Sequence, residues 1–427
     1  MSSTSPASLS GRAAFTSLSV PNYRLFAVGG LISNSGTWMS RIAQDWLVLN
    51  ITGSSFAVGV TTALQFLAMA ALGLYGGLIA DRYPKRRILL CTQTATAVLA
   101  LTLAALTLSG HVRLWHVYVI AFLLGVATVV DNPARQAFVV EMVGRDHIRN
   151  AVSLNSASFQ VARLVGPVLA GALIGAFGEG WAFLCNGLSF LAPLAGLLLM
   201  RTRDLHPIEL APRRKGQLRE GLSYVAARPD LRWSLVLVGF IGTFGLNLPI
   251  WLSAFAHDVF HGDASAYGLF NTSTAVGSVT GALLAARRST TGRRLLIGSA
   301  TGFGLLEAAA ALSPSRGVFL VLLAPVGLFA LTFNTTVNVR LHIATDPAMR
   351  GRVMSMLMIV FVCGTPIGGP AAGWITDTYG ARFGLLCGGL VTAGTAIGIG
   401  AVLARTAGLR LRPGLPRERT QRTDSTA

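Results

Sequence analysis

Charged side chains, and acidic ones above all, are scarce in this sequence. Only 12% of its 427 residues are charged, and 17 aspartates and glutamates stand against 35 lysines and arginines. By contrast, 52% of the residues are hydrophobic and the mean hydropathy is +0.59. A soluble domain of this length needs far more charge on its surface. The scarcity excludes a soluble globular protein and indicates an integral membrane protein.

Cysteine and histidine are also few. The four cysteines lie in or beside apolar runs without CxxC spacing, which excludes a disulfide framework, and the seven histidines form no metal-ligand set. No GxxxxGK[ST] loop is present, so the chain does not hydrolyse ATP through one. We therefore expect no enzyme activity, no cofactor and no bound metal. We also expect no cleaved signal peptide, because the N-terminus lacks a short apolar region with a small-residue cleavage site.

Long apolar runs dominate the chain. A membrane-spanning helix needs about 20 predominantly apolar residues. Twelve runs meet this need, at residues 24–49, 56–80, 88–109, 115–137, 153–176, 181–200, 232–255, 266–286, 294–312, 317–339, 352–376 and 382–404. The sequence predicts an all-α integral membrane protein with twelve transmembrane helices.

Basic residues fall on one side of this arrangement. Alternate connections hold the basic cluster at 82–87, the basic stretch 201–232 and the C-terminal tail, whereas the opposite loops hold only Arg113, Arg316 and Arg382. Because basic loops stay in the cytoplasm, both termini are predicted to be cytoplasmic. The net charge of +18 then reports topology and attraction to anionic membrane lipid rather than binding to nucleic acid.

Five segments follow from this topology. They are a cytoplasmic tail (1–22), a six-helix half (23–200), a cytoplasmic linker (201–231), a second six-helix half (232–404) and a disordered cytoplasmic tail (405–427). Within the linker, the amphipathic piece from Leu218 to Ala227 predicts one surface helix.

The two halves repeat each other weakly. Residues 77–82 correspond to 282–287, and residues 166–171 correspond to 369–373, each pair about 200 residues apart and in the same order. This order is that of two parallel halves. The second copy of the first motif lacks its acid, so only the first copy can make an acid-dependent contact.

Three motifs carry a family resemblance. They are the loop Gly76-Gly77-Leu78-Ile79-Ala80-Asp81-Arg82-Tyr83-Pro84-Lys85-Arg86-Arg87, the helix-five segment 162–171 around Gly166-Pro167, and Asp131-Asn132-Pro133. With them the chain resembles the major facilitator superfamily, in particular its bacterial drug:proton antiporters and enterobactin-type exporters. The arginine that many such antiporters carry in helix four would fall near Ala121, and it is missing.

The resemblance implies roles for three sets of residues. Helices one, four, seven and ten would line a central cavity, to which helix one contributes Asn34 and Trp38 and the second half contributes Thr243, Asn247, Trp251, Asn334 and Asn338. The loop after helix two would gate the cytoplasmic side through Gly77, Asp81, Arg82, Arg86 and Arg87, with Asp81 helping to lock the outward-facing state. Two Gly-Pro motifs would act as close-packing and kinking elements, through Gly166, Pro167, Gly171, Gly369 and Pro370.

Ionisable residues inside predicted spans are candidates for transport chemistry, because a charge in the membrane is costly. In helix one, Asn34, Trp38, Arg41 and Asp45 recur at helical spacing. Asp45 can pair with Arg41 and exchange that partner for a proton. The alternative is that Asp45 lies near the outer interface and only neutralises Arg41.

Helix four repeats the spacing with Asp131 and Arg135, for which a structural clamp is the alternative. Arg163, which precedes Gly166, is a candidate for contact with substrate. Glu307 in helix nine is expected to snorkel or to pair within the second half, and Glu141 is expected to be a solvated loop residue.

These features predict a secondary active transporter of the bacterial inner (plasma) membrane that works as a monomer. It would export small amphipathic organic molecules in exchange for protons, with Asp45 and Asp131 as candidate proton sites. Two alternatives stay open. One is a dedicated exporter of a siderophore or another metabolite, and the other is a membrane-embedded receptor that binds without transporting.

Overall fold

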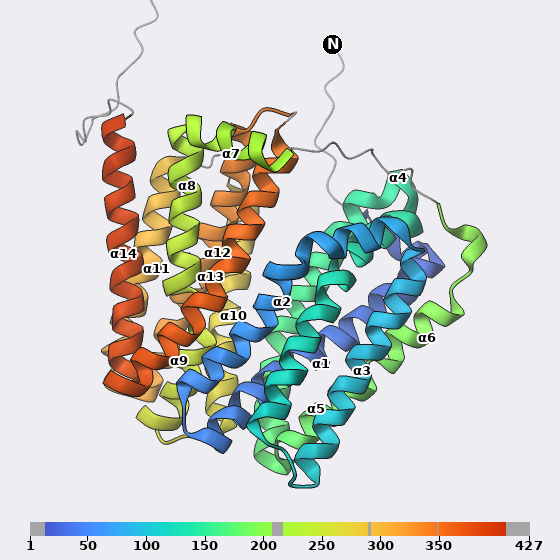
Figure 1. The fold of residues 1–427 in the computed structure, drawn as a ribbon, viewed down its shortest axis with the longest axis horizontal. Helices are drawn as coiled ribbons and strands as arrows, with labels where there is room; N and C mark the ends of the chain where they lie inside the picture. Colours follow the sequence, from blue (N-terminus) through green and yellow to red (C-terminus); the bar gives the residue numbers. More distant parts are fainter. Residues whose placement is uncertain (1–12, 207–216, 289–291, 348, 407–427) are drawn as a thin grey trace, which may run out of the picture.

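The computed structural model describes residues 13–206, 217–288, 292–347 and 349–406, and within them the regular structure is helical. Two helical bundles lie side by side and are connected through the short helix α7 (Gln217–Ala227) (Figure 1). The first bundle holds α1 (Pro21–Thr52), α2 (Ser55–Arg82), α3 (Lys85–Leu108), α4 (Leu114–Phe177), α5 (Glu179–Ser189) and α6 (Leu191–Leu199). The second holds α8 (Pro229–Phe240), α9 (Leu248–Ala254), α10 (Ala264–Arg287), α11 (Arg293–Ala311), α12 (Arg316–Ala344), α13 (Arg350–Tyr379) and α14 (Ala381–Thr406).

The long helix α4 consists of two membrane-length stretches. Gly144 has φ 64° and ψ −178°, which interrupts the helix between Leu114–Gly144 and His147–Phe177. Glycine adopts this backbone without the steric cost that a side chain would impose. Helical structure therefore occupies most of residues 138–152, which the predicted spans leave out.

The seventh predicted span is irregular. Between α8 and α9 the chain forms a π-helical turn, η3 (Ile241–Gly245), and a second one, η4 (Phe255–Val259), follows α9. A proline near the start of α9 suits this restart, because proline has no amide hydrogen to contribute to a continuous helix. Turns of this kind are frequent at functional sites.

Nine stretches of the described chain are long and apolar enough to cross a membrane. The predicted spans at α1, α10 and α11 are not among them. Their sequences show why: α1 carries Arg41 and Asp45, α10 is rich in serine and threonine, and the 19-residue α11 carries Glu307 and begins with two arginines. The all-helical membrane fold is thus clear, while three of the twelve predicted spans are too polar to be recognised by apolarity.

Apolar packing joins the bundles at one end. We call the end that carries α7 the linker end, and the end that carries the turns at Gly53 and Gly380 the far end. The larger apolar cluster runs through the second bundle and into the first, where it includes Trp46 and Val58. A separate cluster, with Tyr23 and Phe138, lies in the first bundle alone. Consistently, the ribbons of the two bundles diverge toward the linker end (Figure 1).

The predicted surface helix of the linker is confirmed, since α7 covers Gln217–Ala227. Part of the predicted N-terminal tail is ordered against the first bundle: a 3₁₀ helix spans Ala13–Ser19, and the Ser17 hydroxyl donates to Asn150 Oδ1 at 2.6 Å. The remainder of that tail, the linker residues 207–216 and nearly all of the predicted tail 405–427 lie outside the described residues.

Candidate functional site

A polar cavity of about 620 Å³ lies within the first bundle. Helices α1, α2, α3, α4 and α5 supply its lining, which includes Asn34 and Arg41 from α1 and Asp131 and Arg135 from α4. Most of the other lining groups are amides and hydroxyls. Cavities of roughly this volume, with a few convergent polar groups, hold drug-sized organic molecules. The cavity is therefore the candidate substrate site.

Asp131 is the acid in the lining of this cavity, and three donors bind its carboxylate. Arg135 Nε donates to Asp131 Oδ2 at 3.0 Å, with the two side chains 17% and 15% exposed. Thr92 Oγ1 and Gln93 Nε2 both donate to Asp131 Oδ1 at 2.7 Å. The predicted ion pair between Asp131 and Arg135 is confirmed. Since the carboxylate also lines the cavity, a proton that reached it would compete with Arg135.

An arginine–tryptophan cluster adjoins the cavity. Two guanidinium groups approach the Trp38 ring, with Arg41 Cζ 5.0 Å and Arg163 Cζ 5.7 Å from its centroid. Phe159, which lines the cavity, meets Trp38 edge-on at 5.7 Å. Cations over an indole face are attracted by its quadrupole. In the described residues neither arginine forms an ion pair with a carboxylate, so both remain available to an anionic group.

The predicted ion pair between Arg41 and Asp45 is not formed in the described chain. Instead, Tyr267 of α10 donates its hydroxyl hydrogen to Asp45 Oδ2 at 2.7 Å. Trp46 stacks on Tyr267 with ring centroids 6.3 Å apart and meets His257 edge-on. The predicted pair was wrong because packing between the bundles brings the Tyr267 hydroxyl to the carboxylate. Asp45 thus contacts the opposite bundle toward the far end, outside the cavity lining.

A second polar contact between the bundles involves Asp377, near the end of α13. Its carboxylate accepts hydrogen bonds from Ser54 Oγ at 2.6 Å, from Ser55 N at 2.7 Å and from Phe56 N at 3.1 Å. These donors lie at the N-terminus of α2, where the first amides of a helix have no partner within the helix. Asp377 therefore caps a helix of the opposite bundle and fastens the far end.

Sequence reasoning missed both Tyr267 and Asp377. Tyr267 gives no local signal, because its partner is far away in sequence. Asp377 did give one, since it is an acid at the edge of a predicted span in a chain that has few acids.

Both Gly-Pro motifs lie where helices approach closely. A Cβ on Gly171 of α4 would come within 2.9 Å of the backbone of α10, and one on Gly369 of α13 would come within 2.9 Å of the backbone of α2. Gly166 lies in the same way against Trp38 on α1. Pro167 and Pro370 stand inside α4 and α13. The motifs therefore occupy two helix pairs through which the bundles touch.

The second-half residues predicted to line the cavity are engaged elsewhere. The Trp251 indole is only 1% exposed and packs against glycines of α14. Thr243 donates to the Gly239 carbonyl, and Asn247 donates to the Thr243 carbonyl at 2.6 Å, so both satisfy the irregular backbone around η3. Asn338 donates to Asn334 on its own helix. None of the five lines the cavity described here, because that cavity belongs to the first bundle.

The loop after α2 and the start of α3 form several polar contacts at the linker end. Lys85 Nζ lies 3.3 Å from Glu141 Oε1, with the two side chains 12% and 13% exposed. Glu141 is thus a helical, mostly buried ion-pair partner, and its prediction as a solvated loop residue was wrong. Arg86 donates to the last carbonyls of α6, at 2.7 and 3.2 Å.

The other residues of the predicted gate lie on or beside the same helix end. Gly77 and Asp81 are half-buried on α2, and Arg82 and Arg87 are exposed.

Glu307 on α11 also departs from expectation. It is 0% exposed, and neither carboxylate oxygen has a hydrogen-bond partner within the described chain. Its neighbours include Gly389 on α14, whose added Cβ would lie 3.0 Å from Glu307 Cβ. Packing between α11 and α14 therefore encloses the side chain and prevents the snorkelling that was predicted.

Two acids connect the linker helix to the second bundle: Glu220 of α7 pairs with Arg352 of α13 at 2.8 Å, and Asp346 binds two residues at the other end of α7. Tyr224 Oη donates to Asp346 Oδ2 at 2.8 Å, and Arg228 Nη2 lies at the same distance from that oxygen. The hydrogen bond from Tyr224, with help from the Arg228 charge, holds the pKa of Asp346 below its ordinary value. This contact connects α7 to the loop between α12 and α13.

Two helical bundles that pack side by side are the arrangement of major facilitator transporters. A solved bacterial homolog of the human lysosomal transporter Spinster matches with a TM-score of 0.71 at 15% identity, over 92% of this chain and 99% of that one. The family model described as transmembrane secretion effector matches residues 12–418. The chain belongs to this family of the major facilitator superfamily, and it is a multi-pass membrane transporter, not an enzyme.

Three curated relatives show the range of the family. The chain is 22% identical over 329 residues to the staphyloferrin A transporter of Staphylococcus aureus, covering 76% of this chain and 82% of the relative. It is 24% identical over 370 residues to the multidrug efflux pump Tap of Mycolicibacterium fortuitum, covering 83% and 89%. It is 23% identical over 382 residues to the enterobactin exporter EntS of Shigella boydii, covering 87% and 91%.

Proposed function

We propose that this protein is a secondary active transporter that exports small amphipathic organic molecules from a bacterial cell in exchange for protons. In this proposal the protein is a monomer, and twelve helices, including the polar α1, α10 and α11, cross the plasma membrane. In this proposal the linker end and both termini lie in the cytoplasm, which the basic loops support. Substrate enters the first-bundle cavity from that side.

The observation that carries the proposal is the position of the Asp131–Arg135 pair on the cavity wall. Asp131 already accepts hydrogen bonds from three donors, which hold its carboxylate on the cavity wall. A proton delivered to it would neutralise the acid and weaken its hold on Arg135. The released guanidinium changes the charge that the substrate meets, and this links proton binding to substrate release.

Alternating access in this proposal uses the far-end contacts as a gate. Tyr267–Asp45 and the cap by Asp377 hold the far end closed while the bundles diverge toward the linker end. Opening the far end requires these bonds to break, and the glycine-lined helix pairs let the bundles rock as units. A proton on Asp45 would leave it a poorer acceptor for Tyr267, which makes Asp45 the second candidate proton site.

Export as the direction rests on the family and on the printed activities of relatives. The family is described as a secretion effector, and two of the three relatives are named as an efflux pump and an exporter. The receptor alternative lacks such support.

The test is transport in inverted membrane vesicles with an imposed pH gradient and a panel of dyes and antibiotics. Wild-type vesicles should accumulate a substrate, Asp131→Asn should lose gradient-driven uptake while keeping substrate binding, and Asp45→Asn should slow it. Glu179→Gln, which removes a far-end acid bonded only to Asn50 of its own bundle in the described chain, is the matched control. Uptake that ignores the gradient, or Asp131→Asn with wild-type uptake, would refute the proton role.

A second candidate function, export of an anionic siderophore or another acidic metabolite, is favoured by the arginine–tryptophan cluster. Arg41 and Arg163 flank Trp38 without a carboxylate partner in the described residues, and guanidinium groups recognise carboxylates and similar anions by paired hydrogen bonds. Arg163→Gln should then weaken uptake of acidic compounds by about tenfold and leave cationic dyes unchanged. Equal loss for both classes would favour a structural role for the cluster.

A further inference from the structure

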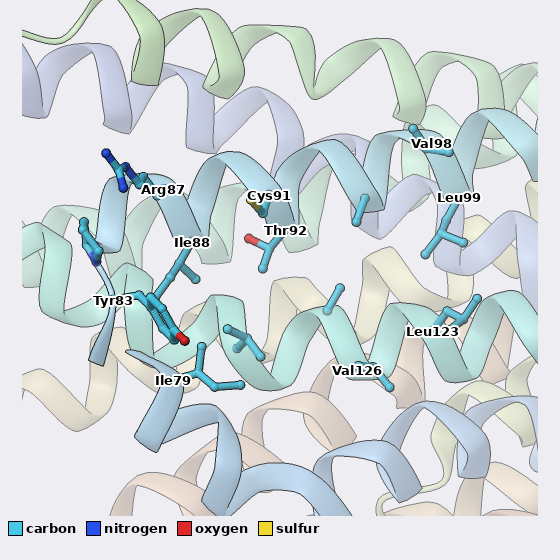
Figure 2. Close-up of a pocket in the computed structure, with 14 residues that line it drawn as sticks. Ile79, Tyr83, Arg87, Ile88, Cys91, Thr92, Val98, Leu99, Leu123 and Val126 are labelled. Atoms are coloured by element: carbon cyan, nitrogen blue, oxygen red, sulfur yellow. The ribbon is translucent and has the colours of Figure 1, made fainter. Parts of the chain in front are cut away.

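An apolar groove runs along the outside of the first bundle, opposite the polar cavity. It has a volume of about 750 Å³ and lies between α3 and the first stretch of α4, beside the end of α2. In Figure 2, Ile88 and Leu99 of α3 face Leu123 and Val126 of α4 along its length. Carbon atoms make up nearly the whole lining, so the groove suits a hydrocarbon chain.

The groove faces the membrane and begins at its cytoplasmic surface. Val98 is 55% and Leu123 41% exposed, as expected for side chains that contact lipid. Tyr83 and Arg87 line the groove near the start of α3, and Figure 2 shows both toward the same end of it. With the orientation proposed above, this end lies at the level of the inner-leaflet headgroups. Arginine and tyrosine are typical of that depth.

Arg87 is the charged residue of this lining, and its guanidinium binds no other group in the described chain. Among the neighbouring basic residues, Lys85 pairs with Glu141, and Arg86 donates to carbonyls of α6. The Arg87 side chain is exposed and makes no hydrogen bond or ion pair within the described chain. A free guanidinium at the mouth of an apolar groove matches a ligand with an anionic head and a hydrocarbon tail.

The groove also lies one side chain away from the substrate cavity. Thr92 contributes to the groove wall, and its hydroxyl donates to Asp131, which lines the cavity. An occupant of the groove would therefore contact the residue that holds the cavity carboxylate in place.

We propose that this groove binds an anionic phospholipid of the inner leaflet. One acyl chain lies between α3 and α4, and the phosphate accepts hydrogen bonds from the Arg87 guanidinium. Guanidinium binds phosphate through two parallel hydrogen bonds, and the negative inner leaflet supplies the ligand at high local concentration. A zwitterionic lipid fits less well, because its own cation competes for the phosphate.

Cys91 provides a reporter, because it lines the groove one turn beyond Arg87 and its side chain is exposed. Cys185 on α5 is also exposed and does not line the groove, so it serves as an internal reference. The purified full chain is reconstituted in phosphatidylcholine vesicles with or without phosphatidylglycerol. Alkylation of each cysteine by N-ethylmaleimide is followed by mass spectrometry of peptides.

Phosphatidylglycerol should slow alkylation of Cys91 by about fivefold relative to Cys185, the effect of one basic contact at an anionic surface. Arg87→Gln should abolish this protection, whereas Arg82→Gln, an exposed neighbour that does not line the groove, should retain it. Native mass spectrometry should then show one retained phosphatidylglycerol that Arg87→Gln loses.

Three results would overturn the proposal. If Cys91 is alkylated equally slowly in vesicles with and without phosphatidylglycerol, any acyl chain fills the groove and its headgroup is not recognised. Protection by an added transport substrate but not by phosphatidylglycerol would make the groove a substrate entrance. Protection that rises with protein density at constant lipid composition would assign it to a second copy of the chain.

Discussion

The far-end cap by Asp377 should set the balance between the two access states. Asp377 on α13 accepts hydrogen bonds from Ser54, Ser55 and Phe56 at the start of α2, so these bonds exist only while the far end is closed. Because the Ser54 hydroxyl also accepts from Ala57 N, α2 retains a cap of its own when Asp377 is absent. Loss of Asp377 should therefore destabilise the closed state and not the helix.

The magnitude follows from the bonds that are lost. Removal of an N-terminal cap costs about 0.5–2 kcal/mol, and a carboxylate at a helix N-terminus contributes about 0.3–1 kcal/mol more through the helix dipole. Asp377 is exposed, so the dipole part is screened by salt. Asp377→Ala should then favour far-end opening by about 2 kcal/mol, a population shift of roughly 30-fold. Asp377→Asn keeps one acceptor oxygen and should increase the population with an open far end about fivefold.

Distances between two spin labels, measured by double electron–electron resonance, can detect this change. Spin labels at Ile51→Cys and Phe383→Cys, which are exposed residues of opposite bundles near the far end, are introduced after replacement of the native cysteines. Asp377→Ala should add a population at longer distance, and high salt should reduce the difference between Asp377→Asn and wild type. Glu179→Gln is the charge-matched control. Identical distance distributions for wild type and Asp377→Ala would refute the reasoning.

Three further predictions concern stability and the linker. Gly277→Val should prevent recovery of folded protein, because its Cβ would collide with a carbonyl of α12 and overpacking costs about 1–3 kcal/mol or more. Glu307→Gln should keep the melting temperature within a few degrees, since a buried neutral amide replaces an acid without partners in the described chain. The α7 contact should persist at neutral pH. Because the folded-state pKa of Asp346 is lowered, its stabilisation is present above the ordinary aspartate pKa and is lost as pH falls through the lower folded-state value. Cleavage near α7 by pepsin, a protease that is active in acid, should rise only below that pH, and Tyr224→Phe should move the threshold upward.

Each of these predictions has an outcome that contradicts it. Gly298→Val, at a glycine with open space around it, is the control for Gly277 and should yield normal amounts in size-exclusion chromatography. A large loss of melting temperature in Glu307→Gln would mean that its carboxylate is ionised and needed. If proteolysis near α7 shows the same pH profile in wild type and in Tyr224→Phe, Asp346 does not control the pH dependence of that cleavage.

The sequence by itself determined the class of the protein and most of its elements. Runs of about 20 apolar residues and alternating basic loops are local properties, and the bilayer imposes them on any chain that crosses it. The surface helix at 217–227 and the pair Asp131–Arg135 were likewise predictable, because helical spacing of four residues brings side chains together without reference to the rest of the fold. The Gly-Pro motifs were found from the repeat.

Only the tertiary structure decided which helices those residues meet. Asp45 accepts a hydrogen bond from Tyr267 and does not pair with Arg41, and Glu141 forms an ion pair with Lys85. Trp251 packs on α14, and Glu307 is enclosed without a hydrogen-bond partner in the described chain. Each depends on the docking of helices that are distant in sequence, and helical periodicity fixes the face of a side chain but not its neighbour. The same is true of Asp377, whose partners lie more than 300 residues away. The chain itself specifies its helices, while packing between the helices and between the bundles specifies the cavity and the contacts at the far end.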